Sequence, residues 1–127
     1  MSSKARHILV VDDEPGICAA IKMMFRHDGH HVEVAHNAKD ALALLELHPF
    51  SLVTTNYNML GMKGDELAAI IKQSRPHLPI IMITAHAYAL KSSGQPLPNV
   101  DCLISKPFLL ADLRAAVAKF PLRPPAE

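Results

Sequence analysis

The stretch HILVVDDEP at residues 7–15 sets a pattern that the rest of the chain repeats. Residues 7–11 form a continuous, largely β-branched run, which is typical of a strand buried on both faces of a parallel sheet. Three acidic residues follow at once, and Pro15 then stands where the first turn of a helix tolerates proline. The stretch therefore predicts a buried strand that runs into a group of carboxylates at the start of a helix.

Apolar runs and helical periodicity alternate along the whole chain. Further strands are predicted at residues 31–35, 50–55, 79–84 and 102–105. Apolar residues at helical spacing lie between them, and a last helix is predicted to carry Leu110, Leu113, Val117 and Phe120. Five strand–helix repeats imply an α/β class fold, a doubly wound three-layer sandwich with helices on both faces of a parallel sheet.

Length and composition are those of one ordinary globular domain. The 127 residues carry a formal net charge of +1, and 50% of them are hydrophobic. No basic surplus favours nucleic acid, no apolar run is long enough to span a bilayer, and no signal peptide is visible. Cys18 and Cys102 lie in apolar stretches, which favours reduced core thiols over a disulfide. We expect a cytoplasmic protein without direct nucleic-acid or membrane contacts.

Polar residues follow four of the predicted strands. Asp12 and Asp13 come after the first, Asn56 after the third, Thr84 ends the fourth, and Lys106 follows the fifth. Each has a structural explanation of its own, such as carboxylates that favour a helix N-terminus. Ligands of open parallel sheets, however, bind beyond the carboxyl ends of the strands. Convergence of all these groups on one rim therefore makes a functional site the better interpretation.

Four motifs in this order resemble the receiver domain of two-component response regulators, over residues 5–120. The motifs read ILVVDDEPGI, NYNMLGMKG, IIMITA and SKPF. The resemblance implies a flavodoxin-like, CheY-like fold with five parallel strands in the order 2-1-3-4-5. In that family a central aspartate takes a phosphoryl group from a histidine kinase, and Mg²⁺ neutralises the phosphate oxygens.

The resemblance also implies a role for each residue of the rim. The acidic pair and the backbone carbonyl of Asn58 take the places of Mg²⁺ ligands. Thr84 takes the place of the switch threonine, and Lys106 that of the lysine that contacts the phosphate. The family turn also implies a cis peptide bond before Pro107, the isomer that only proline makes cheap. Lys106 is expected to pair with one of the two aspartates where a metal would sit.

The phosphoacceptor position holds an amide, because Asn56 stands where the family motif has an aspartate. A carboxylate can attack phosphorus to form an acyl phosphate, whereas an amide is neutral and a poor nucleophile. Asn56 therefore preserves size and hydrogen bonding but removes the chemistry. With one carboxylate fewer, we expect Mg²⁺ to bind weakly at most.

Other parts of the switch also depart from the family pattern. Leu60 replaces a usual proline, and Leu103 stands where an aromatic switch residue is usual. The region of the fourth helix contains Gly94, Pro96 and Pro98. We expect a degraded fourth helix of at most two turns near residues 87–92, followed by an extended loop. Several failures in one switch favour natural loss of switching over a single engineered substitution.

We therefore expect a receiver domain at residues 1–120, followed by a proline-rich tail or the start of a linker at 121–127. It is expected not to be an enzyme and to act by contact with other proteins: a histidine kinase, other signalling proteins or an attached output domain. One alternative is phosphotransfer to another group, including Asp12 or Asp13. A second is a Mg²⁺-dependent phosphohydrolase with Asp13 as its nucleophile.

A group of histidines near the second strand suggests either a metal site or ordinary surface positions. Four histidines lie around the end of the first helix and the second strand: His27, His30, His31 and His36. They show no recognisable ligand spacing, so a solvated surface is the favoured interpretation.

Overall fold

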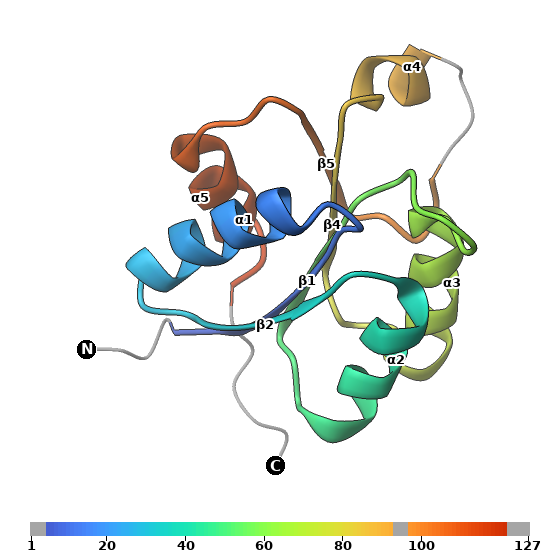
Figure 1. Ribbon diagram of the computed structural model, residues 1–127, viewed down its shortest axis with the longest axis horizontal. Coiled ribbons are helices and arrows are strands. Elements are labelled where there is room, and N and C mark those ends of the chain that lie inside the picture. The colour runs from blue at the N-terminus through green and yellow to red at the C-terminus, as the bar shows by residue number, and fades with distance from the viewer. Residues whose placement is uncertain (1–4, 93–96, 122–127) are drawn as a thin grey trace.

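Figure 1 shows the computed structural model of the chain, which describes residues 5–92 and 97–121. The strands are β1 (His7–Val11), β2 (His31–Ala35), β3 (Leu52–Thr55), β4 (Ile80–Thr84) and β5 (Cys102–Ser105). The helices are α1 (Pro15–His27), α2 (Ala38–Leu47), α3 (Gly64–Ser74), α4 (Ala87–Ser92) and α5 (Leu110–Ala118). Strand and helix alternate throughout, as the sequence predicts.

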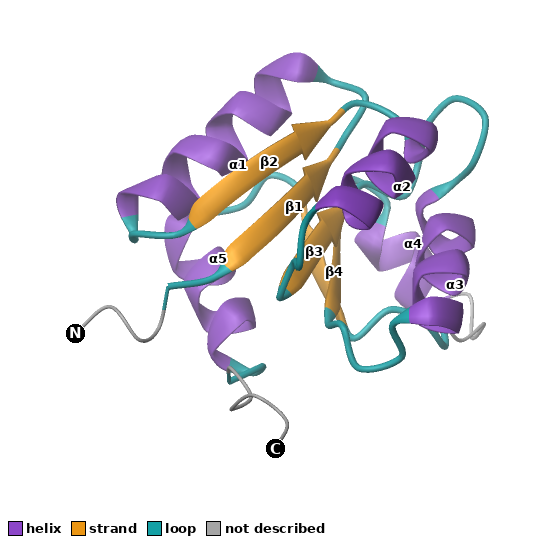
Figure 2. Cartoon of the chain, turned by 90° about the horizontal axis from the view of Figure 1, so that it is seen from below, coloured by secondary structure: helices purple, strands orange, loops and turns teal. Residues whose placement is uncertain are grey.

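The strands form a parallel five-stranded sheet in the order β2-β1-β3-β4-β5. This order confirms the predicted doubly wound, flavodoxin-like fold. Helices α1 and α5 cover one face of the sheet, and α2 and α3 cover the other (Figure 2). The strand order changes direction between β1 and β3, so the carboxyl ends of these two strands form the switch point where such folds bind ligands.

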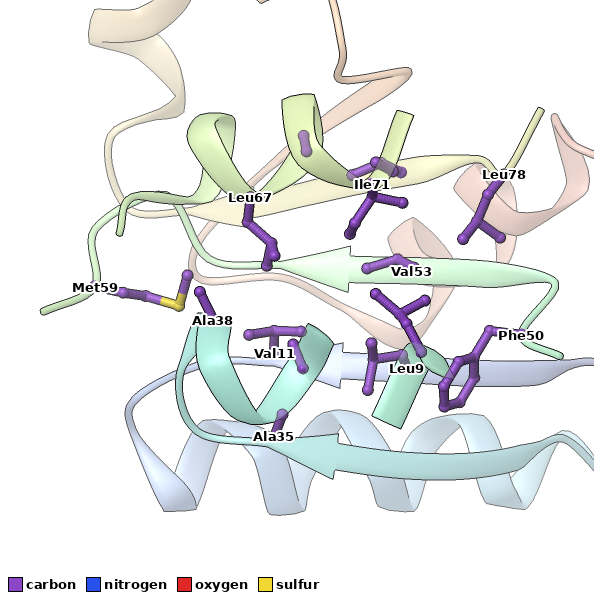
Figure 3. Packing of buried hydrophobic residues seen from close by; sticks show 14 residues of the cluster. Leu9, Val11, Ala35, Ala38, Phe50, Val53, Met59, Leu67, Ile71 and Leu78 are labelled. Carbon is purple, nitrogen blue, oxygen red and sulfur yellow. The ribbon is translucent and has the colours of Figure 1, made fainter. Parts of the chain in front are cut away.

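Two apolar clusters lie on opposite faces of the sheet. Alternate residues of β1 point to opposite sides, so Ile8 and Val10 join the cluster under α1 and α5, whereas Leu9 and Val11 join the other. Figure 3 shows the second cluster, in which side chains of α2 and α3 pack on β1 and β3. Burial on both faces explains why β1 reads as an unbroken apolar run.

Some predicted boundaries were wrong by a few residues. β3 begins at Leu52 and β4 at Ile80, later than predicted, and Pro79 has no N–H to donate to a ladder. α5 ends at Ala118, so Phe120 lies just beyond it, although its side chain still packs against the core. The last turn tightens, because Lys119 and Phe120 donate to carbonyls three residues earlier.

The two cysteines are free thiols, as predicted. Cys18 is buried in α1, but Cys102 is only half-buried on β5 and is not a full core residue.

Helix α4 spans six residues, Ala87–Ser92, at the place where the sequence predicts a helix. Gly94 and Pro96, and with them most of the predicted extended loop, lie outside the described residues. Pro98 lies in a turn that the N–H of Val100 closes on the carbonyl of Leu97, at 3.0 Å. Within residues 5–92 and 97–121, no helix is long and apolar enough to cross a membrane.

Candidate functional site

Asp12 lies at the carboxyl end of β1 and is the buried acid of the rim. Its side chain Oδ2 accepts a hydrogen bond from Lys106 Nζ at 2.9 Å, and Oδ1 accepts from the N–H of Glu14 at 3.0 Å. The residue is only 1% exposed. A buried carboxylate is costly unless it is paired and hydrogen-bonded, and here both of its oxygens have a donor.

Lys106 connects the strand ends across the switch point. Its ammonium pairs with Asp12, lies 3.5 Å from Asn56 Oδ1 and lies 3.7 Å from Glu14 Oε1. Its backbone N–H donates to the carbonyl of Thr84 at 2.9 Å, which continues the β4–β5 pairing by one residue. The peptide bond from Lys106 to Pro107 is cis, as the resemblance implied.

Asn56 follows β3 directly, and its amide contacts two partners. The backbone N–H donates to the carbonyl of Val11 at 2.9 Å, which places the side chain beside the end of β1. Side-chain Nδ2 donates to the carbonyl of Asn58 at 2.9 Å, and Oδ1 faces Lys106. Only this amide orientation serves both partners, because an ammonium can only donate and a carbonyl can only accept. The residue is 7% exposed and is held at both ends of its amide.

The loop after Asn56 returns closely to the strand end. A Cβ on Gly64, the first residue of α3, would lie 2.0 Å from the carbonyl oxygen of Asn56, so only glycine fits there. Gly61 has φ 84°, which favours glycine in the turn between them. Met59 is buried in the core and Leu60 is exposed, so the loop is anchored on one side only.

The acid pocket, which we define as Asp12, Asp13, Glu14, Asn56 and the carbonyl of Asn58, matches a Mg²⁺ site only in part. Carboxylate oxygens of the three acidic residues lie within 4.8 Å of one another. Mg²⁺ requires near-octahedral oxygen ligands. The carbonyl of Asn58, however, already accepts from the amide of Asn56, and both carboxylate oxygens of Asp12 already have donors. Of the carboxylates in the acid pocket, only those of the exposed acids, Asp13 and Glu14, remain unengaged by these bonds.

The two predicted switch positions lie on neighbouring strands. Thr84 is fully buried at the end of β4, where its Oγ1 accepts from the N–H of His86 at 3.1 Å. Leu103 is half-buried on β5 and pairs in register with Met82. The structure thus joins Asp12, Asn56, Asn58 and Lys106 in one hydrogen-bonded network. Thr84 is linked to it through its backbone carbonyl.

Three further residues contact the network, although the sequence analysis does not assign them to this site. Glu14 was recognisable as a neighbour of the acidic pair, and its carboxylate approaches Lys106. Cys18 donates its thiol hydrogen to the carbonyl of Asp12 at 3.1 Å, one helical turn after the acids. Burial, followed by the negative charge of Asp12, raises the pKa of Cys18 to about 11. The thiol therefore stays protonated near neutral pH and is a poor nucleophile.

His36 is the third of these contacts and arises from the fold rather than from a sequence motif. Its Nδ1 lies 3.3 Å from the carbonyl of Asp12. Of the other three histidines near the second strand, two lie at the surface as predicted and one does not. His27 and His31 are exposed, whereas His30 is half-buried and its Nδ1 accepts from the N–H of Arg6 at 3.0 Å.

The profile of the response regulator receiver domain matches residues 8–118. This chain belongs to the response regulator receiver family. Chemotaxis protein CheY-3 of Vibrio cholerae is 32% identical over 120 residues, which cover 92% of each chain. The crystal structure of response regulator TrrA from Thermotoga maritima, in complex with Mg²⁺–BeF, superposes with a TM-score of 0.82 at 30% identity, and covers 91% of this chain and 98% of TrrA.

Longer regulators are also similar to this receiver domain. Transcriptional regulatory protein GlrR of Escherichia coli is 30% identical over 107 residues, which are 84% of this chain but 24% of GlrR. The chain thus spans about a quarter of the length of the first curated relatives that it matches. Family membership establishes a receiver domain of two-component signalling, and such domains are in general signalling modules rather than enzymes.

Proposed function

We propose that this receiver domain is not phosphorylated at residue 56 and acts by protein–protein contact with its rim held in one state. The observation that carries the proposal is the amide of Asn56, which donates to the carbonyl of Asn58 and faces Lys106 with its oxygen. A neutral amide cannot form the acyl phosphate that an aspartate forms. The same amide also completes a network that needs neither metal nor phosphate to be satisfied.

Other nucleophiles of the pocket are poorly suited to replace the missing aspartate. Both carboxylate oxygens of Asp12 accept hydrogen bonds, and the raised pKa of Cys18 keeps its thiol protonated. Asp13 is exposed and stays the best acceptor for the alternative in which phosphotransfer continues. Asp13 is also the nucleophile of the phosphohydrolase alternative. We expect no turnover of a generic aryl phosphate, and turnover would support that alternative.

Weak Mg²⁺ binding is part of the same proposal. The TrrA structure contains Mg²⁺–BeF in a similar fold. In this chain, Lys106 lies 2.9 Å from Asp12, and an N–H of Asn56 occupies the carbonyl of Asn58. A metal ion that binds here must therefore displace the hydrogen bonds that Asp12 and the carbonyl of Asn58 accept. It must also lie close to the positive charge of Lys106. We expect saturation only at millimolar Mg²⁺, and tight micromolar binding would contradict this.

Signalling through the usual moving parts is also proposed to be lost. Leu103 has no aromatic ring to move, α4 has only six residues, and the hydroxyl of Thr84 is engaged by the N–H of His86.

We propose that residues 1–120 act as the receiver domain and that residues 121–127 form a tail or linker. Partners are then a histidine kinase, other signalling proteins or an output domain. Longer relatives such as GlrR support the last of these.

Acetyl phosphate tests the central claim. The native protein, incubated with Mg²⁺ and acetyl phosphate, should keep its intact mass, because residue 56 cannot attack phosphorus. The variant Asn56→Asp restores the nucleophile and should gain one phosphoryl mass. Asn58→Asp is the matched control, since it makes the same amide-to-acid change two residues away and should gain none.

The position of any phosphoryl group decides between the proposal and its alternatives. A phosphoryl mass on the native protein that peptide mapping assigns to Asp13 would establish the alternative acceptor. Failure of Asn56→Asp to react, with the native protein also inert, would mean that the rest of the pocket has lost its activity as well.

A further inference from the structure

Two histidines and a glutamate meet at the amino-terminal edge of the sheet, away from the acid pocket. His7 opens β1, Glu33 lies on β2, and His48 caps the end of α2. One ligand atom from each side chain lies within 4.8 Å of those of the other two, and His7 Nε2 lies 3.6 Å from Glu33 Oε2. We call these three residues the histidine cluster. The sequence did not reveal it, because its members come from three separate elements.

The topology explains why these side chains face one another. In the parallel β1–β2 pairing, His7 is opposite His31 and Leu9 is opposite Glu33. Residues two apart on a strand share a face, so His7 and Glu33 both point to the face that α2 covers. Since α2 ends at Leu47, the next residue, His48, leaves the helix at this edge.

The backbone of each histidine is fixed by hydrogen bonds. The N–H of His48 donates to the carbonyl of Leu44 at 3.0 Å, and its own carbonyl accepts from the N–H of Phe50 at 3.1 Å. The carbonyl of His7 accepts from the N–H of Ser51 at 2.8 Å. Ligands carried by fixed backbone need little reorganisation to bind an ion.

The donor set is that of a transition-metal site. Two imidazoles and one carboxylate, with water in a fourth position, form a common open tetrahedral Zn²⁺ site. Zinc ligands at about 2.0–2.1 Å from the metal lie roughly 3.3 Å from one another. The 3.6 Å between His7 and Glu33 is close to that value, and rotation of half-buried side chains can close the remaining separation to His48. Imidazole ligands suit Zn²⁺, Ni²⁺ or Cu²⁺, whereas Mg²⁺ prefers oxygen.

The surroundings of the histidine cluster shield it on one side. The buried ring of Phe50 lies 4.6 Å from the ring of His7 and 5.7 Å from that of His48, between centroids. An apolar wall of this kind lowers solvent access and strengthens metal binding. Arg75 is the cation beside it, but its guanidinium donates to the backbone carbonyls of Leu45 and His48, which keeps it at the end of α2.

We propose that the histidine cluster binds one Zn²⁺ ion, or a similar divalent ion of the late first row, independently of the acid pocket. The five residues of β1 separate the two sites by about 16 Å, at roughly 3.3 Å per residue. A bound ion would join β1, β2 and the end of α2, so it should stabilise the folded chain by mass action.

Calorimetric titration with Zn²⁺ tests the proposal on the native chain and on variants. We expect one site on the native protein, with Glu33→Gln and His48→Gln each weakening binding at least tenfold. Glu33→Gln keeps shape and hydrogen bonding, so it is the variant least expected to disturb folding. The matched control is the double variant His27→Gln/His77→Gln, which removes two exposed histidines elsewhere and should leave the affinity unchanged.

Two readouts keep the test decisive. At a fixed Zn²⁺ concentration, the rise in Tm should be equal for the native protein and the control and clearly smaller for Glu33→Gln. On the native protein alone, NMR signals of the His7 and His48 rings should shift first as Zn²⁺ is added. Absence of binding, equal affinity in Glu33→Gln, or first shifts at other histidines would each overturn the proposal. Asp13→Asn should leave Zn²⁺ binding intact, and a loss in that variant would place the ion in the acid pocket.

Discussion

The two helices that follow β1 and β4 differ greatly, although the last four residues of β1 and all five residues of β4 are buried. α1 runs for 13 residues and buries Cys18, Ile21 and Phe25 against the sheet. α4 has six residues and carries Tyr88, which is 84% exposed. Asp12, at the end of β1, forms an ion pair with the distant Lys106. Thr84, at the end of β4, accepts a hydrogen bond with its hydroxyl from the N–H of His86, only two residues later.

We infer from this difference that the fold and the proposed switch depend on different residues. The apolar residues of the strands and of α1 form the two buried clusters that stabilise the receiver fold. The residues that move in a switching receiver lie around α4 and β5, and there the chain has a short helix and Leu103. A fold can keep its architecture while the chemistry on its rim changes.

The largest effect is expected from a buried aromatic of α1. Phe25 is 1% exposed, so Phe25→Ala should lower the free energy of unfolding by about 3–5 kcal/mol through lost burial and the cavity left behind. Tyr88→Ala removes an aromatic of similar size from α4 and should cost about 0.5 kcal/mol or less. Urea denaturation measures both values.

A milder substitution guards against loss of folding. Phe25→Leu keeps most of the apolar volume and should fall between the other two variants. If Phe25→Ala and Tyr88→Ala lower the free energy of unfolding equally, α4 stabilises the fold as much as α1 does. That result would contradict the difference between the two helices.

The apolar pattern was sufficient to predict the architecture, because burial leaves a periodic trace in the sequence. The helical spacing of Ile17, Ile21, Met24 and Phe25 predicts α1, and the unbroken apolar run of residues 7–11 predicts β1. Element ends were less predictable, since they depend on single hydrogen bonds. The end of α5 before Phe120 is one example, because the tightened last turn leaves no apolar signal.

The next effect concerns the buried ion pair of the rim. Lys106→Met removes the partner of Asp12 and leaves a buried carboxylate, so it should cost about 3 kcal/mol. Lys72→Met breaks the more exposed pair with Asp101 and should cost about 1 kcal/mol or less. Chemical denaturation at neutral pH gives both numbers.

A double variant separates the pair from the burial of each member. Asp12→Asn/Lys106→Met should recover much of the stability lost in Lys106→Met, because the uncompensated charge is gone. If the double variant is as unstable as the sum of the single ones, the two residues do not act as a pair.

The rim itself was predictable only in part. Strand ends of a parallel sheet converge, so the approach of Lys106 to an aspartate followed from the predicted fold. The bond from the Asn56 amide to the carbonyl of Asn58 depends on the path of one loop, which no periodicity encodes. The histidine cluster needs the end point of α2 and the β1–β2 register together, and neither is known from residue spacing alone.

The smallest effect is expected from the ion pair between Asp28, which caps the end of α1, and the exposed Arg114 of α5. Arg114 donates from Nε to Asp28 Oδ2 at 2.9 Å and from Nη2 to Oδ1 at 2.7 Å. This hydrogen bonding holds the pKa of Asp28 below its ordinary value of 3.8. A carboxyl whose pKa is lowered by folding stabilises the folded state above its unfolded pKa, and this contribution is lost as pH falls toward the folded pKa. Because Arg114 is exposed, salt and water screen the pair strongly.

Arg114→Gln should therefore lower the Tm slightly near neutral pH, and the difference from the native protein should vanish as pH falls below the ordinary pKa of Asp28. Carboxyl NMR should show the pKa of Asp28 returning toward its ordinary value in the variant. Added salt should shrink the difference in Tm, since the charges are solvent-exposed. A difference that stays the same on acidification would mean that Arg114 stabilises the α1–α5 side by packing of its aliphatic stem, and not by its charge.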